Sequence, residues 1–524
     1  MALKNTFRPS PWLPALLVAA LGLTPAWPQT LPSLGDSEGM SLSAERQLGD
    51  RIARELYRDP DYLEDPVLDE YIQRLWQPLV KAAAARGDLQ PDLQARFAWR
   101  ILLGRDRTVN AFALPGGYLG VHLGLIAVVG SDDELASVLA HELSHVTQRH
   151  IARSMDSQGK MSPLVIGSML LGVLAASRSA QGAQALIVGG QAAAMQSQLS
   201  YSRDMEREAD RVGYGVLGEA GYDPRGFVGM FGRLQQAAGV NDNGSFPYLR
   251  SHPLTTERIA DMQARQELAP NAPMPAPNMV QAMMAGRARV LAQNTVDALR
   301  AWTQDGQLAL ASTGTKGQMP AQATHAAAAA RAGALYAATL AHVQLRDMAA
   351  AERSLQALEQ WTEGQPAARR LVRLLRAEMA FKQERFEVVL QVLAPQRDAA
   401  GGQRPELIAT AQALVRLPVR AAHADVTRQL REWVTQAPQD AQAWNMLAGL
   451  QTVQGHTLPA LRAEGEAQMA RMDWQGAMDR FRAAQDWAKS HALQPGDHIE
   501  ASIVDTRLRE VQALIRAMHA ERER

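Results

Sequence analysis

The sequence predicts an α+β domain, mainly helical with a small sheet, followed by an all-α array of helical pairs. Three observations lead to this prediction. Ala, Leu, Gln and Arg are abundant while aromatic residues make up only 5%, a composition that favours helices over sheets. Strand-like runs are concentrated in residues 96–126. From about residue 325 to the end, apolar residues recur almost wholly at helical spacing.

Length, charge and cysteine content narrow the possible classes. A chain of 524 residues is expected to form two or three domains. Lys plus Arg (54) equals Asp plus Glu (54), so the overall charge gives no case for nucleic-acid binding. The chain has no cysteine, which excludes disulfides, thiol nucleophiles, thiolate ligands and a lipoprotein acyl-Cys anchor.

The N-terminus is typical of a secretory signal peptide. Lys4 and Arg8 precede an apolar run over residues 13–23, and small residues follow up to Ala26. We therefore expect residues 1–26 to be a signal peptide. An uncleaved anchor is the alternative, although the run is short for a membrane span.

Two helices and a small sheet are expected next. Apolar spacing predicts helices over residues 43–57, with Ser43 as a possible cap, and from Asp65–Pro66 to about Leu79. Extended patterns over residues 97–103, 109–114 and 118–122, with a turn at Pro115–Gly117, predict strands.

The helix predicted at residues 136–146 carries two histidines and a glutamate. His141 and His145 are four residues apart, about one helical turn, so both imidazoles project from one face. Two neutral imidazoles and one oxygen ligand can hold a zinc ion with a position left for water. Glu142 is placed to take a proton from that water. Structural helices also carry histidine pairs, but the apolar residues around this one favour a buried site for one Zn²⁺ per chain.

A peptide substrate could add a strand to the predicted sheet beside this site. Glycine permits close approach of another backbone, so Asn110, Gly116 and Gly117 are candidate residues of a substrate-binding strand. The alternative is a hairpin that only packs on the helix. His150 lies nine residues after His141, on roughly the opposite helical face, so we expect a solvated or capping residue.

An apolar region over residues 163–194 follows. Its two runs are shorter than the roughly 20 residues of a spanning helix. They predict buried or surface-lying helices, or a mobile flap over the active site, and at most peripheral membrane contact.

Two later segments offer further polar groups. Glu206 and Asp210 are one turn apart on a predicted helix, and a carboxylate is what the histidine pair lacks. An acid one turn later can accept the N–H of a ligand histidine. The alternative is a solvated charged face. His252 is held out of helix by Pro253, and could be structural or could reach the open zinc position.

The C-terminal half is expected to be a separate domain. Residues 269–278 are rich in proline and predict a semi-rigid linker between a domain at 27–268 and one at 279–524. Gly465, Ala477, Phe481 and Ala484 fit a tetratricopeptide unit, and the period is irregular but near 34 residues. We expect a tetratricopeptide-like solenoid with a concave binding surface, and a generic helical bundle is the alternative.

Three segments resemble the gluzincin peptidases related to the CAAX prenyl protease: residues 110–117, 133–145 and 202–210. The resemblance implies an α+β metalloprotease domain with zinc on His141, His145 and Glu206. It implies Glu142 as the general base and Asp210 as support for a ligand. It also implies that His252, in its S-H-P-L segment, closes the zinc as a fourth ligand and keeps the protease latent.

The resemblance also implies a setting for this activity. With the signal peptide and the repeats, the chain is expected in the periplasm of a Gram-negative bacterium, acting on unfolded or stalled outer-membrane proteins. The repeat domain would bind the β-barrel assembly machinery. A chaperone or assembly scaffold with a latent protease is the second hypothesis. A membrane-embedded prenyl-protein protease would need sustained apolar spans that the sequence lacks.

Overall fold

The computed structural model describes residues 40–157, 202–238, 246–267, 278–311, 321–397 and 403–522. The predicted signal peptide at 1–26 and the apolar segment at 163–194 lie outside these residues, as does all but Asn278 of the predicted linker.

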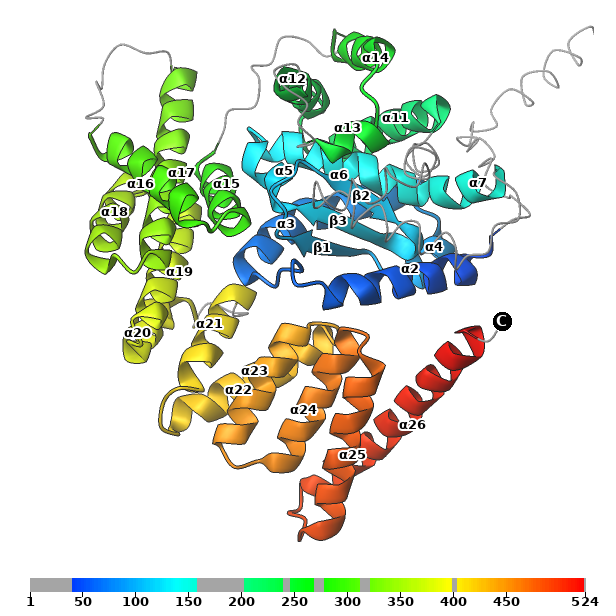
Figure 1. Cartoon of the computed structure of the whole chain (residues 1–524), viewed down its shortest axis with the longest axis vertical. Helices are drawn as coiled ribbons and strands as arrows, with labels where there is room; N and C mark the ends of the chain where they lie inside the picture. The colour runs from blue at the N-terminus through cyan, green and yellow to red at the C-terminus, as the bar shows by residue number, and fades with distance from the viewer. Residues whose placement is uncertain are drawn as a thin grey trace, which may run out of the picture. The chain divides into compact units, whose positions relative to one another are not determined.

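The first part of the described chain is α+β, as predicted, with helices around a small sheet (Figure 1). Its elements are α2 (Leu42–Arg58), α3 (Pro66–Ala85), α4 (Pro91–Arg96), β1 (Arg100–Gly104), β2 (Ala111–Leu114), the 3₁₀ turn η1 (Pro115–Gly117), β3 (Tyr118–His122), α5 (Leu123–Val128), α6 (Asp132–Thr147), α7 (His150–Ser157), α11 (Arg203–Glu219), α12 (Gly226–Ala238), α13 (Pro247–Ser251) and α14 (Thr256–Glu267).

The sheet has three strands in the order β1-β3-β2, so β2 is an edge strand. β3 pairs parallel with β1 and antiparallel with β2. The predicted strands are confirmed, but β1 begins at Arg100, because Trp99 has a φ of 51° and is not extended. The first helix begins one residue before the predicted cap, and Ser41 rather than Ser43 accepts a hydrogen bond from its first turn.

Gly116 and Gly117, which follow β2, allow two neighbouring segments of the chain to pack closely. Gly116 and Gly117 have φ of 73° and 85°, a region that favours glycine. Both are buried in η1. A Cβ on Gly116 would lie 2.9 Å from the Arg46 Cα of α2, and one on Gly117 would lie 2.9 Å from the Phe97 Cβ. The predicted turn at Pro115–Gly117 is therefore confirmed, and a part of Gly116 and Gly117 in binding substrate stays a prediction.

Helix α6 lies at the centre of this part. Ser131 caps it by accepting a hydrogen bond from the Glu134 N–H at 3.1 Å. Every residue from Glu134 to Thr147 is buried, because α3, α11 and α12 pack around the helix and β2 contacts it. A helix buried on all sides needs partners for each polar side chain that it carries.

The second part of the described chain is entirely helical, as predicted. Its helices are α15 (Met279–Ala292), α16 (Val296–Ala311), α17 (Ala321–Gln344), α18 (Met348–Trp361), α19 (Pro366–Lys382), α20 (Phe386–Arg397), α21 (Arg404–Leu414), α22 (Ala421–Gln436), α23 (Ala441–Val453), α24 (Thr457–Ala470), α25 (Trp474–Ser490) and α26 (Asp497–Arg522). α15 ends at Ala292 and α16 begins at Val296, so a short break separates these two helices.

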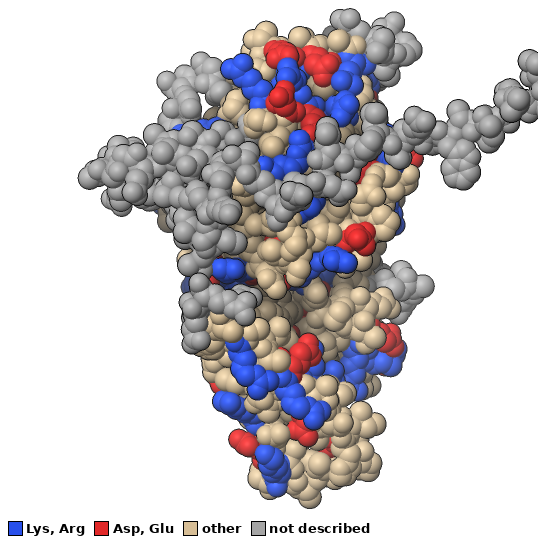
Figure 2. All heavy atoms as spheres, turned by 90° about the vertical axis from the view of Figure 1, so that its right-hand side faces the viewer, with Lys and Arg blue, Asp and Glu red and all other residues tan. Residues whose placement is uncertain are grey.

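Consecutive helices in this part pack against each other. The predicted pair at Gly465 and Phe481 joins α24 to α25: a Cβ on Gly465 would lie 2.4 Å from the Phe481 ring. Among the described residues, no helix is long and apolar enough to cross a membrane. On the face drawn in Figure 2, basic and acidic side chains are interspersed rather than gathered by sign.

Arginines of the helical part pair with two carboxylates that lie just before α3. Arg287 of α15 contacts Asp65 at 2.7 Å and Glu378 at 2.8 Å. Arg471 contacts Glu64 at 2.7 Å. Asp65 also caps α3 by accepting a hydrogen bond from the Leu68 N–H at 2.9 Å, so the same carboxylate begins a helix and holds a buried cation.

Replacing Arg287 should therefore destabilise the protein. Arg287 and Asp65 are 5% and 6% exposed, and removing one partner of a buried pair costs about 3–5 kcal/mol. We expect Arg287→Met to lower the thermal unfolding temperature clearly. Arg428→Met is the control, because its pair with Glu432 is more than 60% exposed on both sides and is worth less than about 1 kcal/mol. Equal unfolding temperatures for the two variants would contradict the prediction.

Candidate metal centre

Four side chains from three segments meet in the interior. They are His141 and His145 of α6, Glu206 of α11, and His252, which follows α13. One nitrogen or oxygen of each lies within 4.8 Å of all the others. All four residues are buried. The structure therefore brings together the three predicted ligands and the predicted fourth residue.

The two α6 imidazoles project from one face, as the four-residue spacing predicts. Their Nε2 atoms are 3.0 Å apart. The Glu206 carboxylate lies 3.5 Å from the His141 Nε2 and 3.4 Å from the His145 Nε2. The Nε2 atoms of both histidines thus face the same carboxylate, in the arrangement that a metal would need.

His252 lies against this group. Its Nδ1 is 2.9 Å from a Glu206 oxygen and 3.3 Å from the His141 Nε2. The backbone N–H of His252 donates to the Tyr248 carbonyl at 2.9 Å. The His252 and Tyr248 rings lie 4.7 Å apart between centroids. The loop after α13 therefore holds this imidazole among the other three side chains.

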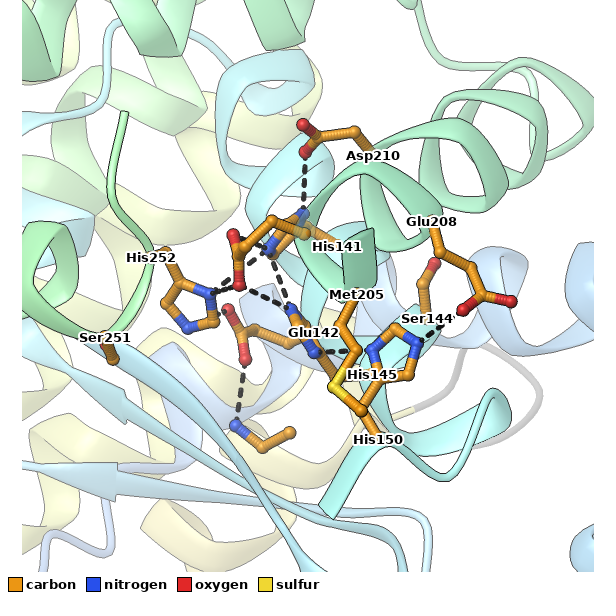
Figure 3. Close-up of polar contacts among 12 residues, drawn as sticks. His141, Glu142, Ser144, His145, His150, Met205, Glu208, Asp210, Ser251 and His252 are labelled. Carbon is orange, nitrogen blue, oxygen red and sulfur yellow. Dashed lines mark hydrogen bonds and ion pairs between the residues drawn. The ribbon is translucent and has the colours of Figure 1, made fainter. Parts of the chain in front are cut away.

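Glu142 faces the same space from the next position on α6. Its Oε2 accepts a hydrogen bond from the Ala113 N–H of the edge strand β2 at 2.8 Å. Its Oε1 lies 3.4 Å from the His252 Nε2 and makes no hydrogen bond among the described residues. The side chain is fully buried. One carboxylate oxygen is thus fixed by the sheet and the other is directed at the four-residue group (Figure 3).

Asp210 supports both a ligand and a buried arginine. Its Oδ1 lies 2.9 Å from the His141 Nδ1, on the side of the ring away from Nε2. Arg258 of α14 donates to both Asp210 oxygens at 2.7 and 2.8 Å, and contacts Glu206 at 2.7 Å. It also donates to the Pro253 carbonyl at 3.0 Å. Arg258 was not predicted from the sequence, because no spacing rule distinguishes it from other arginines of an amphipathic helix.

His150 contradicts the expectation of a solvated or capping residue. It is fully buried, and its Nδ1 lies 2.9 Å from the Nδ1 of His145. Its Nε2 lies 3.1 Å from Glu208 of α11. The expectation failed because α6 ends at Thr147, and Arg149, with a φ of 52°, turns the chain before α7 begins. Helical periodicity does not extend through such a turn.

The buried charges perturb one another strongly. Burial favours the neutral form of His141, but hydrogen bonds to Asp210 and Glu206 outweigh it and raise its pKa to about 9. Burial also opposes charge on Glu206, and His252 together with the two ligand imidazoles lowers the pKa of that carboxyl. Burial raises the pKa of Glu142. Without a metal, a proton is therefore held on His141, and a metal ion has to displace it.

The donor set fits zinc. Imidazole nitrogens and a carboxylate oxygen are ligands that zinc takes in proteins, usually four in number and tetrahedral. Each α6 ligand also has a polar partner at Nδ1, which leaves Nε2 for the metal. The Glu142 Oε1, buried and without a hydrogen bond among the described residues, is directed at the same position.

His141, Glu142 and His145 form the H-E-x-x-H pattern that is typical of zinc metallopeptidases. Residues 66–266 match the model of Peptidase family M48, which is a family of zinc metalloproteases. The resemblance seen in the sequence is thereby confirmed.

Three relatives that are named as proteases or as a metalloendopeptidase are similar to this chain in sequence. The putative beta-barrel assembly-enhancing protease of Vibrio cholerae is 38% identical over 245 residues, which is 46% of this chain and 49% of that protein. The beta-barrel assembly-enhancing protease of Escherichia coli is 34% identical over 261 residues, 48% of this chain and 52% of that protein. The mitochondrial metalloendopeptidase OMA1 of Arabidopsis thaliana is 32% identical over 198 residues, 37% of this chain and 36% of that protein. The matched part spans about half the length of the first two relatives.

Proposed function

We propose that this protein is a zinc endopeptidase with one Zn²⁺ per chain. The observation that carries the proposal is the buried group of His141, His145, Glu206 and His252, with Glu142 directed at it. In this proposal the first three hold the metal. When bound, zinc would polarise the scissile carbonyl and lower the pKa of a water to about 7.

Glu142 would be the general base and then the general acid. It takes the proton of the attacking water and passes it to the leaving amine. In the metal-free protein, burial raises the pKa of its carboxyl. The Ala113 N–H on its Oε2 holds the carboxyl in place while the Oε1 exchanges the proton.

The substrate would lie extended beside β2. β2 is an edge strand, and an edge strand offers unpaired backbone groups to an added strand. Because the Ala113 N–H is given to Glu142, a peptide paired along β2 would lie next to the base. Asn110, just before β2, would border this strand, whereas Gly116 and Gly117 would contribute only by forming its terminal turn.

We propose that His252 acts as a latch on the zinc. Its Nδ1 lies among the ligand atoms of the other three residues, so it would occupy the position that water needs. His252→Ala should then increase casein cleavage at equal zinc content, because that position becomes free. The control is His423→Ala, which removes a buried histidine of α22 far along the chain. Unchanged or lower cleavage by His252→Ala, with zinc still bound, would count against the latch.

The cellular role is proposed from the relatives and the sequence. Two relatives are named for enhancing β-barrel assembly, which supports misfolded or stalled outer-membrane proteins as substrates, to be degraded or assisted in assembly. The N-terminal pattern supports export to the periplasm. The helical part, as a tetratricopeptide-like array, would bind the client or the β-barrel assembly machinery.

A second candidate is an assembly scaffold whose protease is mostly latent. The position of His252 favours it, because a fourth protein ligand closes a zinc site in the manner of structural sites. A variant that cannot cleave but keeps its fold separates the two candidates.

A further inference from the structure

We propose that His150 is a positioning residue of the metal centre: it accepts the Nδ1 proton of His145 and so keeps the His145 Nε2 free for zinc. This inference rests on the proposed zinc site. It concerns a residue that lies outside the H-E-x-x-H helix and makes no contact with the metal position itself.

The geometry of His145 requires an acceptor at its Nδ1. Its Nε2 faces the group, 3.0 Å from the His141 Nε2 and 3.4 Å from Glu206. A neutral imidazole has one N–H and one lone pair. If Nε2 offers its lone pair to a metal, the proton is on Nδ1. The atom that lies 2.9 Å from that Nδ1 is the Nδ1 of His150.

His150 can accept this proton only in one of its own tautomers. Its Nδ1 must carry the lone pair, so its proton is on Nε2. That atom lies 3.1 Å from a Glu208 oxygen, and Arg153 holds the same oxygen at 2.8 Å. Glu208 is thus the acceptor that fixes His150, and His150 is the acceptor that fixes His145. Figure 3 shows the chain of contacts from Glu208 through His150 to His145.

The backbone conformation of Arg149 allows His150 to contact His145. The left-handed conformation of Arg149, with a φ of 52°, is rare for a residue with a side chain. It brings His150 back beneath the last turn of α6, where the two rings meet edge to face with centroids 4.8 Å apart. Arg149 is held there by Glu45 at 3.0 Å. The two α6 ligands then have different partners at Nδ1: a carboxylate for His141 and a neutral imidazole for His145.

The test is zinc affinity, measured by competition with a chromophoric chelator on the full chain. His150→Phe keeps the ring but removes both nitrogens, and it should weaken zinc binding about 10- to 100-fold, as loss of such a partner does elsewhere. His150→Asn places an amide oxygen where Nδ1 was, so it should recover most of the affinity. The visible spectrum of the cobalt-substituted protein should change in the Phe variant and return towards the wild type in the Asn variant.

A matched control separates positioning from packing. His423 of α22 is also fully buried, and its ring contacts the Leu414 carbonyl at 3.0 Å. His423→Phe should lower the unfolding temperature of the metal-free and zinc-bound protein alike. His150→Phe should in addition reduce the rise in unfolding temperature that zinc produces.

Wild-type zinc affinity in His150→Phe, or an equal loss in the Phe and Asn variants, would overturn the inference. If the Phe variant does not fold, Glu208→Leu decides: it removes the acceptor that fixes His150, and unchanged zinc affinity would then overturn it. Failure of the proposed function would look different. In that case the wild type would not bind zinc, or His145→Ala would bind it equally well.

Discussion

Glu142→Gln should reduce peptide-bond cleavage about 10²- to 10⁴-fold, the contribution typical of a positioned general base. The amide has the size of the carboxyl and can still accept the Ala113 N–H, but it cannot take a proton from water. Zinc content should stay at the wild-type level, because Glu142 is not among the four grouped residues. Casein cleavage, zinc content and outer-membrane protein assembly should be measured on the same preparations.

The assembly measurement separates the two proposed roles. We expect Glu142→Gln to keep assembly assistance while losing cleavage. If assembly were lost equally, with zinc and fold retained, the scaffold role would be excluded. Glu466→Gln is a suitable control, since Glu466 is a buried glutamate of the helical part, paired with Arg507. Cleavage at the wild-type rate by zinc-loaded Glu142→Gln would reject the assignment of the base.

Arg258→Met should cause the largest loss of stability at the metal centre. Arg258 is 4% exposed and is paired with both Asp210 and Glu206. Its removal leaves two buried carboxylates without that countercharge, at a cost of about 3–5 kcal/mol. Zinc affinity should fall about 10- to 100-fold, because Asp210 then loses the partner that orients it towards His141. Thermal unfolding with and without zinc, together with chelator competition, measures both effects.

A nearby surface arginine provides the comparison. Arg207 is on the same helix as Glu206 but is 45% exposed, and it pairs with a Glu257 that is 61% exposed. Arg207→Met should leave both the unfolding temperature and the zinc affinity nearly unchanged, because an exposed ion pair contributes little to stability. If Arg258→Met behaved like Arg207→Met, the buried arginine would not support the centre.

The local patterns of the chain predicted the parts of this centre that depend on one helix or strand. The four-residue spacing placed both α6 imidazoles on one face, and the same spacing placed Glu206 and Asp210 on one face of α11. Strand periodicity located β2 and β3 to within a residue or two. These features follow from periodicity that a sequence displays directly.

What periodicity could not supply are the contacts that depend on turns and on tertiary packing. His150 was assigned to the wrong environment because the left-handed Arg149 ends the helical register. The turn at Gly116 and Gly117 was predicted, but its close packing against Arg46 of α2 was not, because the position of α2 is not encoded locally. Arg258 acquires its role only when α14 packs on α11, a contact between residues almost fifty positions apart.

Helix α11 presents three carboxylates to three different partners. Glu206 faces the metal position, Glu208 contacts His150, and Asp210 contacts the Nδ1 of His141. Inserting or deleting one residue between Asp210 and the buried residues Val212, Val216 and Leu217 would turn all three carboxylates by about 100° relative to that packed face and shift them by about 1.5 Å. Substitutions remove these contacts one at a time, whereas a change of length removes them together. A lineage can therefore exchange residues of this helix singly, but it cannot lengthen or shorten it there without losing the whole centre in one mutational step.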